Sequence, residues 1–284
     1  MSTLSGPLQK LRWTFAAADG AVQKPEPALL IGAEALPLAP LIGSQLRLHF
    51  GGSISCSHCG RKGKRSFGQG YCYPCFKKLA RCDLCMMSPT RCHFESGTCR
   101  EPDWAQDFCF APHSVYLANS SGLKVGITGA DREPTRWVDQ GAVAALVLLH
   151  CDTRQLSGAM EAQLAEHISD RTQWRKMVSG DAEPIDLLAA RAQALGQLGE
   201  LPDGVRVADS VPLEIQYPIR EYGPSKTFAM DKVPLFESTL LGIKGQYLLF
   251  ADGVFNVRRH SGFDIEIHWA SPPRPEPSAQ LEIF

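Results

Sequence analysis

The alternation of apolar and polar positions predicts that both ends of the chain are rich in β-strands. Short strand-like runs separated by Gly and Pro occur early, at LRWTF (residues 11–15), ALLIG (residues 28–32) and QLRLHF (residues 45–50). Similar runs return over residues 205–270. The two ends therefore have the composition of short strands joined by turns.

Two of these stretches resemble each other although they lie far apart. LIGSQLRLHFGG (residues 41–52) and LLGIKGQYLLFADG (residues 240–253) are both strand pairs interrupted by Gly. They indicate that the two ends build one small β-barrel or sandwich around the middle of the chain. The alternative is that unrelated short strands share this composition.

The middle of the chain alternates between strand and helix patterns. Two strand-like runs begin at His113, a short helix begins at Thr135, and AALVLLH (residues 144–150) reads as a buried strand. In AMEAQLAEHI (residues 159–168) the apolar positions recur at helical spacing. Residues 113–200 are therefore expected to form an α/β unit.

These patterns predict an α+β protein with several parts. The expected parts are a β-rich segment (1–55), a cysteine-rich segment (56–112), the α/β domain (113–200), a second β region (201–271) and a Pro-rich tail (272–284). The first and fourth parts are expected to pair.

Composition and hydropathy indicate a cytoplasmic protein without a membrane partner. The chain has 284 residues, of which 44% are hydrophobic and 21% charged. Its longest apolar run, AVAALVLLHC (residues 142–151), is shorter than the roughly 18 residues expected of a membrane helix. The first residues contain no apolar run typical of a secretory signal.

The ten cysteines favour metal binding, because paired thiols in a reducing compartment serve metal ions more often than disulfides. Cys56 and Cys59 form one CxxC pair, and Cys72 and Cys75 form a second pair twelve residues later. Four thiolates satisfy tetrahedral zinc. Cys151 lies in an apolar run and is expected to be a buried thiol.

A second cysteine cluster follows, so one or two structural zinc ions are expected. Cys82 and Cys85 are expected to supply half of the second site. The eligible partners for the other half are Cys92, His93, Cys99 and Cys109. Sequence proximity favours Cys92 and Cys99 and leaves His93 and Cys109 as alternates.

The charge of the cysteine segment points to nucleic acid. Residues 51–100 hold nine Lys and Arg against two Asp and Glu, a net +7 in a chain of net −1. The expected contacts are Arg61, Lys62, Lys64, Arg65, Lys77 and Lys78, interleaved with Phe67, Tyr71, Tyr73 and Phe76. Basic and aromatic residues together grip phosphates and bases. The alternative is a solvated charged face with aromatic side chains packed on the zinc site.

Four residues of the middle domain, one from each of four predicted elements, form a candidate catalytic set. Tyr116 ends the triplet Ser114-Val115-Tyr116, Lys124 begins Lys124-Val125-Gly126, Arg136 opens a helix, and Glu161 lies on a later helix. Over residues 113–178 this order resembles the GIY-YIG nuclease superfamily. The sequence departs from that pattern at Ser114, which replaces the first Gly, and at Lys124, which replaces the second Tyr. The late Asn of the superfamily has no clear match, and Gln173 is the nearest candidate.

The resemblance implies a phosphodiesterase site. Glu161 would hold Mg²⁺ or Mn²⁺, Arg136 would bind the phosphate, and Tyr116 would act as general base or position the water, with Lys124 beside it. The alternative is that Tyr116 and Trp137 are core aromatics and Glu161 a surface residue. The longer chain, with GTCREPDW, LKVGIT and SDRTQWRK, also resembles an uncharacterised bacterial family of unknown function.

The last five residues, QLEIF, resemble the motif by which bacterial DNA-processing proteins dock on the replication sliding clamp. The resemblance implies that Gln280, Leu281, Ile283 and Phe284 contact the clamp, while the Pro-rich residues before them act as a tether. The alternatives are a chance match and a tail that packs on its own β domain.

Together these features predict a zinc-containing DNA-binding protein, and a metal-dependent endonuclease in bacterial DNA repair or replication. Two alternatives stay open at this point. One is an adaptor that binds DNA or RNA without cleaving it. The other is a zinc ribbon that binds proteins, because such ribbons serve both kinds of partner.

Overall fold

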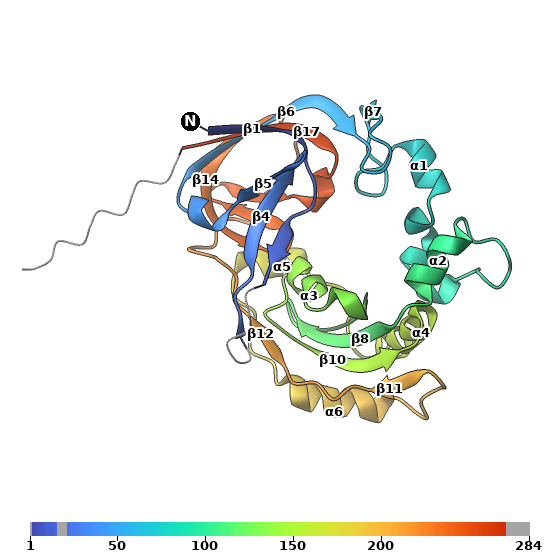
Figure 1. Ribbon diagram of the computed structural model, residues 1–284. Coiled ribbons are helices and arrows are strands. Elements are labelled where there is room, and N and C mark those ends of the chain that lie inside the picture. Colours follow the sequence, from blue (N-terminus) through green and yellow to red (C-terminus); the bar gives the residue numbers. More distant parts are fainter. Residues whose placement is uncertain (1, 16–21, 271–284) are drawn as a thin grey trace, which may run out of the picture.

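The computed structural model describes residues 2–15 and 22–270 (Figure 1). The expected α+β class is confirmed, with helices and several sheets. No helix of the described residues is long and apolar enough to cross a membrane. The clamp-docking residues predicted at 280–284 lie outside the described part of the chain.

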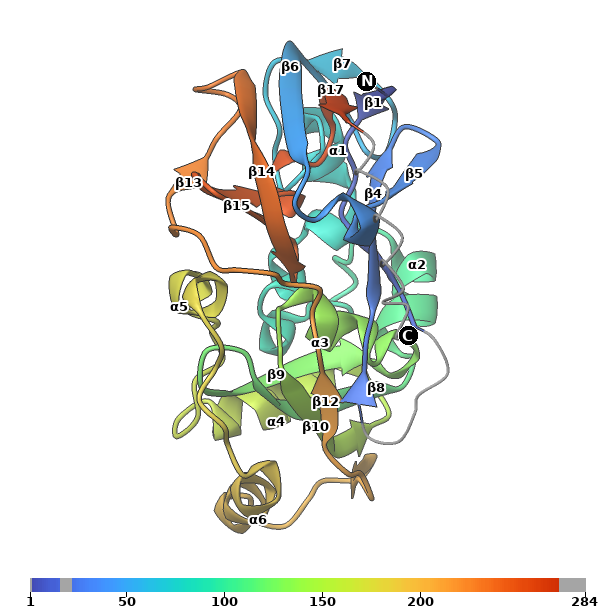
Figure 2. The same ribbon diagram turned by 90° about the vertical axis from the view of Figure 1, so that its left-hand side faces the viewer.

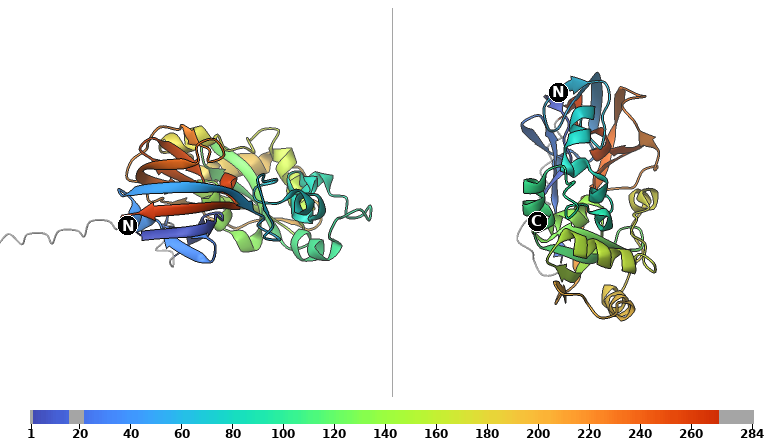
Figure 3. Two further views of the ribbon diagram at one scale, coloured as in Figure 1. Left: turned by 90° about the horizontal axis from the view of Figure 1, so that it is seen from above. Right: turned by 90° about the vertical axis from the view of Figure 1, so that its right-hand side faces the viewer.

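The largest sheet, named here the terminal sheet, joins strands from both ends of the chain. Its main path is β1 (Ser2–Pro7), β17 (Phe263–Trp269), β6 (Gln45–Ser55), β14 (Leu235–Lys244), β15 (Tyr247–Phe250), β16 (Gly253–Asn256) and β13 (Thr227–Phe228), and β7 (Lys62–Gly63) pairs with β6. Strand β17 lies between β1 and β6, with Ile267 opposite both Leu4 and Leu48 (Figure 3). The two ends of the chain are therefore joined by backbone pairing.

The barrel alternative for this region is wrong, because the path runs from β1 to β13 without closing among the described residues. A separate small sheet is formed by β2 (Arg12–Thr14), β4 (Glu26–Ile31) and β5 (Glu34–Pro37). In β4 the residues Leu29 and Ile31 are fully buried, as the alternation predicts. The short helix η1 (Ala39–Leu41) follows.

The middle sheet is formed by the predicted α/β unit and short flanking strands. Its order is β3 (Val22–Gln23), β12 (Leu213–Ile215), β10 (Ala144–Cys151), β8 (His113–Asn119) and β9 (Leu123–Gly129), with β11 (Val205–Val207) also paired to β10. The helices are η5 (Ala130–Arg132), α3 (Thr135–Asp139), α4 (Arg154–Leu164), α5 (Trp174–Ser179) and α6 (Leu187–Gln197). Figure 2 shows α6 at the far end from the terminal sheet.

The middle sheet separates two cores, because successive side chains of a strand point to opposite faces. On β8, Val115 and Leu117 pack in one core with residues of α4 and α6. Tyr116 and Ala118 face the other core, which continues under the terminal sheet. The middle sheet and the terminal sheet therefore share one continuous apolar core.

The cysteine-rich segment connects the two sheets with little regular structure. It contains α1 (Tyr73–Lys78), η2 (Ala80–Cys82), η3 (Leu84–Met86), η4 (Pro89–Arg91), α2 (Pro102–Cys109) and the loops between them. The short helix η6 (Arg258–His260) belongs to the other end of the chain, just before β17. Figure 1 shows this segment along the right-hand side, between the terminal sheet above and the middle sheet below. Metal sites are expected here because so few apolar residues are available to hold such a segment.

Candidate functional site

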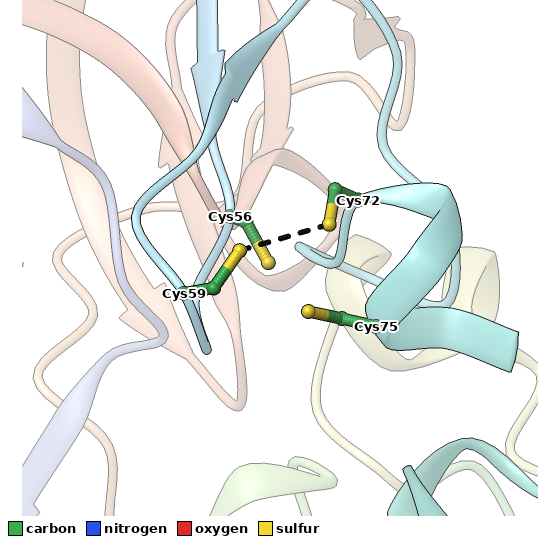
Figure 4. Close-up of side chains that lie close together, drawn as sticks. All are labelled: Cys56, Cys59, Cys72 and Cys75. Carbon is green, nitrogen blue, oxygen red and sulfur yellow. Dashed lines mark hydrogen bonds between the residues drawn. The ribbon is translucent and has the colours of Figure 1, made fainter. Parts of the chain in front are cut away.

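The two CxxC pairs predicted from the sequence form one cluster. Cys56 directly follows β6, Cys59 lies in the next turn, Cys72 caps the N-terminus of α1, and Cys75 lies in that helix. The four sulfurs all lie within 4.8 Å of one another (Figure 4). Residues sixteen positions apart along the chain are thus brought to one point by a turn and a helix start.

The spacing of these sulfurs fits zinc rather than a disulfide. The Sγ atoms of Cys59 and Cys72 are 3.7 Å apart. Zinc–sulfur bonds of about 2.3 Å in a tetrahedron place the sulfurs about 3.8 Å apart, whereas a disulfide requires about 2.05 Å. Burial raises the pKa of Cys56, but the backbone N–H groups of Cys59, Cys72 and His58 lower it to about 6. These four cysteines can therefore hold a structural zinc ion.

The cysteines and the histidine expected at a second zinc site do not all lie together in the structure. Cys85, Cys92 and Cys99 line one small cavity, and Cys109 lines it with them. Cys82 is not among the residues that line it. His93 lies with Asp83 and Cys85. Cys151 is buried in the core of the middle sheet, as expected.

The four predicted catalytic residues come from four elements, β8, β9, α3 and α4. Tyr116 on β8 is fully buried, and Lys124 on β9 is nearly so. The hydroxyl of Tyr116 donates to Oε1 of Gln140 at 2.6 Å, and Nζ of Lys124 donates to the same oxygen at 3.2 Å. Gln140 caps the C-terminus of α3. The sequence offered no signal for Gln140, which depends on the docking of α3 beside the two strands.

Electrostatic effects connect Tyr116 and Lys124 to Arg136 and Glu161. Burial raises the pKa of Glu161, while Lys124 and Arg136 lower it. Burial and the charge of Arg136 lower the pKa of Lys124 to about 8, although Glu161 and Asp170 oppose this shift. Arg136 and Glu161 act on both Tyr116 and Lys124, so these two residues lie within electrostatic range of both charged groups. Asp170, which the sequence did not single out, is a second carboxylate near them.

Tyr116 is less accessible than the nuclease resemblance implies. Burial raises its pKa, and the charge of Arg136 lowers it. Its ring also packs 6.1 Å from that of Trp137, which is buried in the same core. The structure therefore supports the alternative that both aromatic side chains belong to the core. The hydroxyl of Tyr116 is hydrogen-bonded to Gln140.

Gly126 is required by the ring of Tyr116. The two residues are directly opposite on β9 and β8. A Cβ atom at position 126 would lie 2.5 Å from Oη and 2.6 Å from Cζ of Tyr116. The ring of Tyr116 therefore leaves no room for a side chain at position 126, which explains the glycine of the triplet Lys124-Val125-Gly126.

Gly126→Ala is expected to lower the free energy of unfolding by about 3 kcal/mol, because the buried, hydrogen-bonded tyrosine cannot move aside. Urea unfolding measures this change. Gly196→Ala is the matched control: position 196 lies in α6 with no atom within 4 Å, so a small gain of up to about 1 kcal/mol is expected. Equal effects of the two substitutions would contradict the steric explanation.

The stability contributed at Lys124 is expected to depend on pH. Its pKa of about 8 is below the ordinary 10.5, so the unfolded chain binds more protons between these values and wild-type stability rises with pH. Below pH 8 the burial of the charge costs about 3 kcal/mol. Lys124→Met is therefore expected to stabilise the protein most near neutral pH.

Urea unfolding at about pH 7 and about pH 10 tests this prediction through the difference between variant and wild type, since other titrating groups cancel. The advantage of Lys124→Met should shrink at the higher pH. Lys78→Met, at an exposed position on α1, is the control and should show the same difference at both values. If the stability advantage of Lys124→Met grew with pH, the predicted direction of the pH dependence would be wrong.

A basic cavity of about 600 Å³ lies between the cysteine segment and the terminal sheet. Lys64 and Arg65 line it from one side, and Arg258 and Arg259 of η6 from the other. Nε of Arg258 donates to Oε1 of Gln69 at 2.6 Å, which ties the two sides together. Burial lowers the pKa of Arg258 and the charge of Arg136 lowers it further, so Arg136 lies within electrostatic range of the cavity.

Only two of the six basic residues predicted to contact nucleic acid line the basic cavity. Lys64 and Arg65 line the basic cavity, whereas Arg61, Lys62, Lys77 and Lys78 do not. Nζ of Lys62 lies 3.6 Å from a carboxylate oxygen of Asp264. Phe67 packs 5.3 Å from Tyr73 and 6.1 Å from Phe76, so these rings are at least partly structural. The sequence did not identify Arg258 and Arg259, which join this surface only through the pairing of the two chain ends.

Fold and cysteine geometry define a mixed α+β protein with a four-cysteine centre that can hold zinc. A family model described as a protein of unknown function, DUF2797, matches residues 43–265. The chain belongs to this family, which confirms the resemblance to an uncharacterised family. Searches of curated proteins and of solved structures gave no match.

Proposed function

We propose that this protein binds nucleic acid and cleaves a phosphodiester bond with a divalent ion held by Glu161. The observation that supports the proposal is that Tyr116 and Lys124 both donate to Gln140, within electrostatic range of Arg136 and Glu161. A half-buried carboxylate within range of cations suits phosphate chemistry, since the anion must be neutralised and a metal held.

Each residue has a role that its surroundings suit. Glu161, with Asp170 nearby, offers the one or two carboxylates that Mg²⁺ or Mn²⁺ requires. When bound, such an ion supplies an activated water and polarises the phosphate. Arg136 presents a permanent planar charge to the phosphate oxygens. Lys124 can hold or release a proton near its pKa of about 8, and Tyr116 and Gln140 position it.

The direct test is cleavage by purified wild-type protein. Labelled single-stranded, nicked and branched DNA, and RNA of the same sequences, are incubated with Mg²⁺ or Mn²⁺ at low salt. We expect divalent-dependent nicks in at least one substrate and none with chelator. If no substrate is cut with either ion, the catalytic part of the proposal is wrong.

A second candidate function is binding without cleavage, and the burial of Tyr116 favours it. In both cases the basic cavity is the expected path of the phosphate backbone. Docking on a sliding clamp through Gln280, Leu281, Ile283 and Phe284 stays a prediction from the sequence.

Arg65→Glu is expected to weaken nucleic-acid binding about tenfold and to reduce its salt dependence, because it reverses a charge that lines the basic cavity. Lys78→Glu is the matched control: this basic residue was also predicted to bind but lies outside the cavity. Fluorescence anisotropy over a salt series measures both. Equal losses would indicate that the whole charged face binds, and a loss only for Lys78→Glu would place binding elsewhere.

A further inference from the structure

The region between η3 and α2 contains a second, separate concentration of thiols. Cys85, Cys92, Cys99 and Cys109 line one small cavity of about 20 Å³, room for roughly one water-sized sphere. The rest of the lining is His93 and the apolar residues Ala80, Phe94, Trp104 and Ala105. Four cysteines that line one mostly apolar space of atomic size match the donor set of a structural zinc site.

We propose that Cys85, Cys92, Cys99 and Cys109 form a second zinc–thiolate centre, and that Cys82 is not a ligand. Cys85, Cys92, Cys99 and Cys109 all border the same cavity, and Cys82 does not.

A competing set of donors is already engaged. Ligand atoms of Asp83, Cys85 and His93 lie within 4.8 Å of one another. However, Oδ2 of Asp83 accepts from Nε of Arg100 at 2.6 Å, and its Oδ1 accepts from the backbone of Leu84 at 2.6 Å. Nδ1 of His93 lies 2.8 Å from the hydroxyl of Thr98, and its Nε2 lies 3.5 Å from Oδ2 of Asp83. Asp83 and His93 therefore brace the loop around Cys85.

The second centre differs from the first in how far its ligands have converged. Among the described residues, its sulfurs do not meet the 4.8 Å separation that Cys56, Cys59, Cys72 and Cys75 satisfy. Binding would draw the side chains inward by rotation about their Cα–Cβ bonds. All four residues already border the same cavity.

The thiol cluster is docked against α4, the helix that carries Glu161. The guanidinium of Arg154 donates to the carbonyl oxygens of Met86 at 2.8 Å and Cys85 at 3.3 Å. A Cβ atom at Gly158 would lie 2.4 Å from Cβ of Pro89 in η4, so the glycine permits this close contact. Four thiolates around one Zn²⁺ carry a net charge of −2, which the nearby cation of Arg154 partly offsets. The metal would thus hold the surface on which α4 rests.

Zinc content of the full-length protein tests the assignment. We expect two zinc ions per chain in the wild type, one in Cys109→Ser and one in Cys92→Ser. Cys82→Ser and His93→Ala are matched controls and should retain two. A wild type that holds one zinc would overturn the proposal. So would a zinc ion lost in Cys82→Ser but kept in Cys109→Ser, and a loss in His93→Ala would favour the competing set.

A second measurement covers variants that fail to fold. The native wild type is treated with an alkylating reagent, with and without chelator, and the modified cysteines are mapped by mass spectrometry. Cys85, Cys92, Cys99 and Cys109 should be protected until chelator is added, while Cys82 reacts in both cases. Labelling of Cys109 in the zinc-loaded protein, or chelator-dependent protection of Cys82, would contradict the ligand set.

Discussion

Glu161→Gln is expected to reduce divalent-dependent cleavage by about 1000-fold, because the amide cannot supply the negative charge that holds the ion. The side chain keeps its size, and its neighbours Lys124, Arg136 and Arg154 stay in place. Binding of nucleic acid and zinc content should therefore be unchanged. Initial rates on the substrate that the wild type cuts fastest give the measurement.

Glu166→Gln is the matched control for this loss. Glu166 follows α4 by two positions and is exposed, and its replacement changes the net charge by the same amount. It should leave the rate within a factor of about two, as surface substitutions do. A similar loss in both variants would indicate a general charge effect, and no loss in Glu161→Gln would show that the metal is held elsewhere.

Cys72→Ser is expected to remove one zinc ion per chain and to unfold the turn and helix around the first centre. The binding free energy of a structural zinc ion is about 10–16 kcal/mol in small zinc-binding peptides, and it is folding free energy when no other core exists. Around this centre the flanking residues 57–69 and 73–78 have no fully buried side chain, so little else holds them.

Zinc content and limited trypsin digestion measure this effect, since basic residues are frequent between positions 61 and 78. Cleavage there should become rapid in Cys72→Ser. Cys151→Ala is the control: it removes a buried thiol of the middle sheet and should keep both zinc content and resistance. Resistance in Cys72→Ser with a normal zinc content would exclude this cysteine as a ligand.

The predicted catalytic residues show how far reasoning from sequence reached and where it ended. The sequence predicted Tyr116, Lys124, Arg136 and Glu161 as catalytic, and that role stays a prediction. In the structure, Tyr116 and Lys124 each lie within electrostatic range of Arg136 and Glu161. The sequence did not reveal that Tyr116 is buried. Whether Tyr116 faces solvent depends on which side of the middle sheet the terminal sheet covers, and that contact joins residues more than one hundred positions apart.

The chain itself determined the features that depend on neighbouring residues. Strand alternation, the α+β class and the two CxxC pairs of the first cysteine cluster follow from local spacing, because a CxxC turn directs both of its sulfurs to one point. Tertiary structure alone decided the open terminal sheet, the role of Gln140, the basic cavity and the replacement of Cys82 by Cys109 around the second thiol cavity. Each of these requires distant segments to meet, and packing against buried surfaces, rather than spacing along the chain, selects which segments do so.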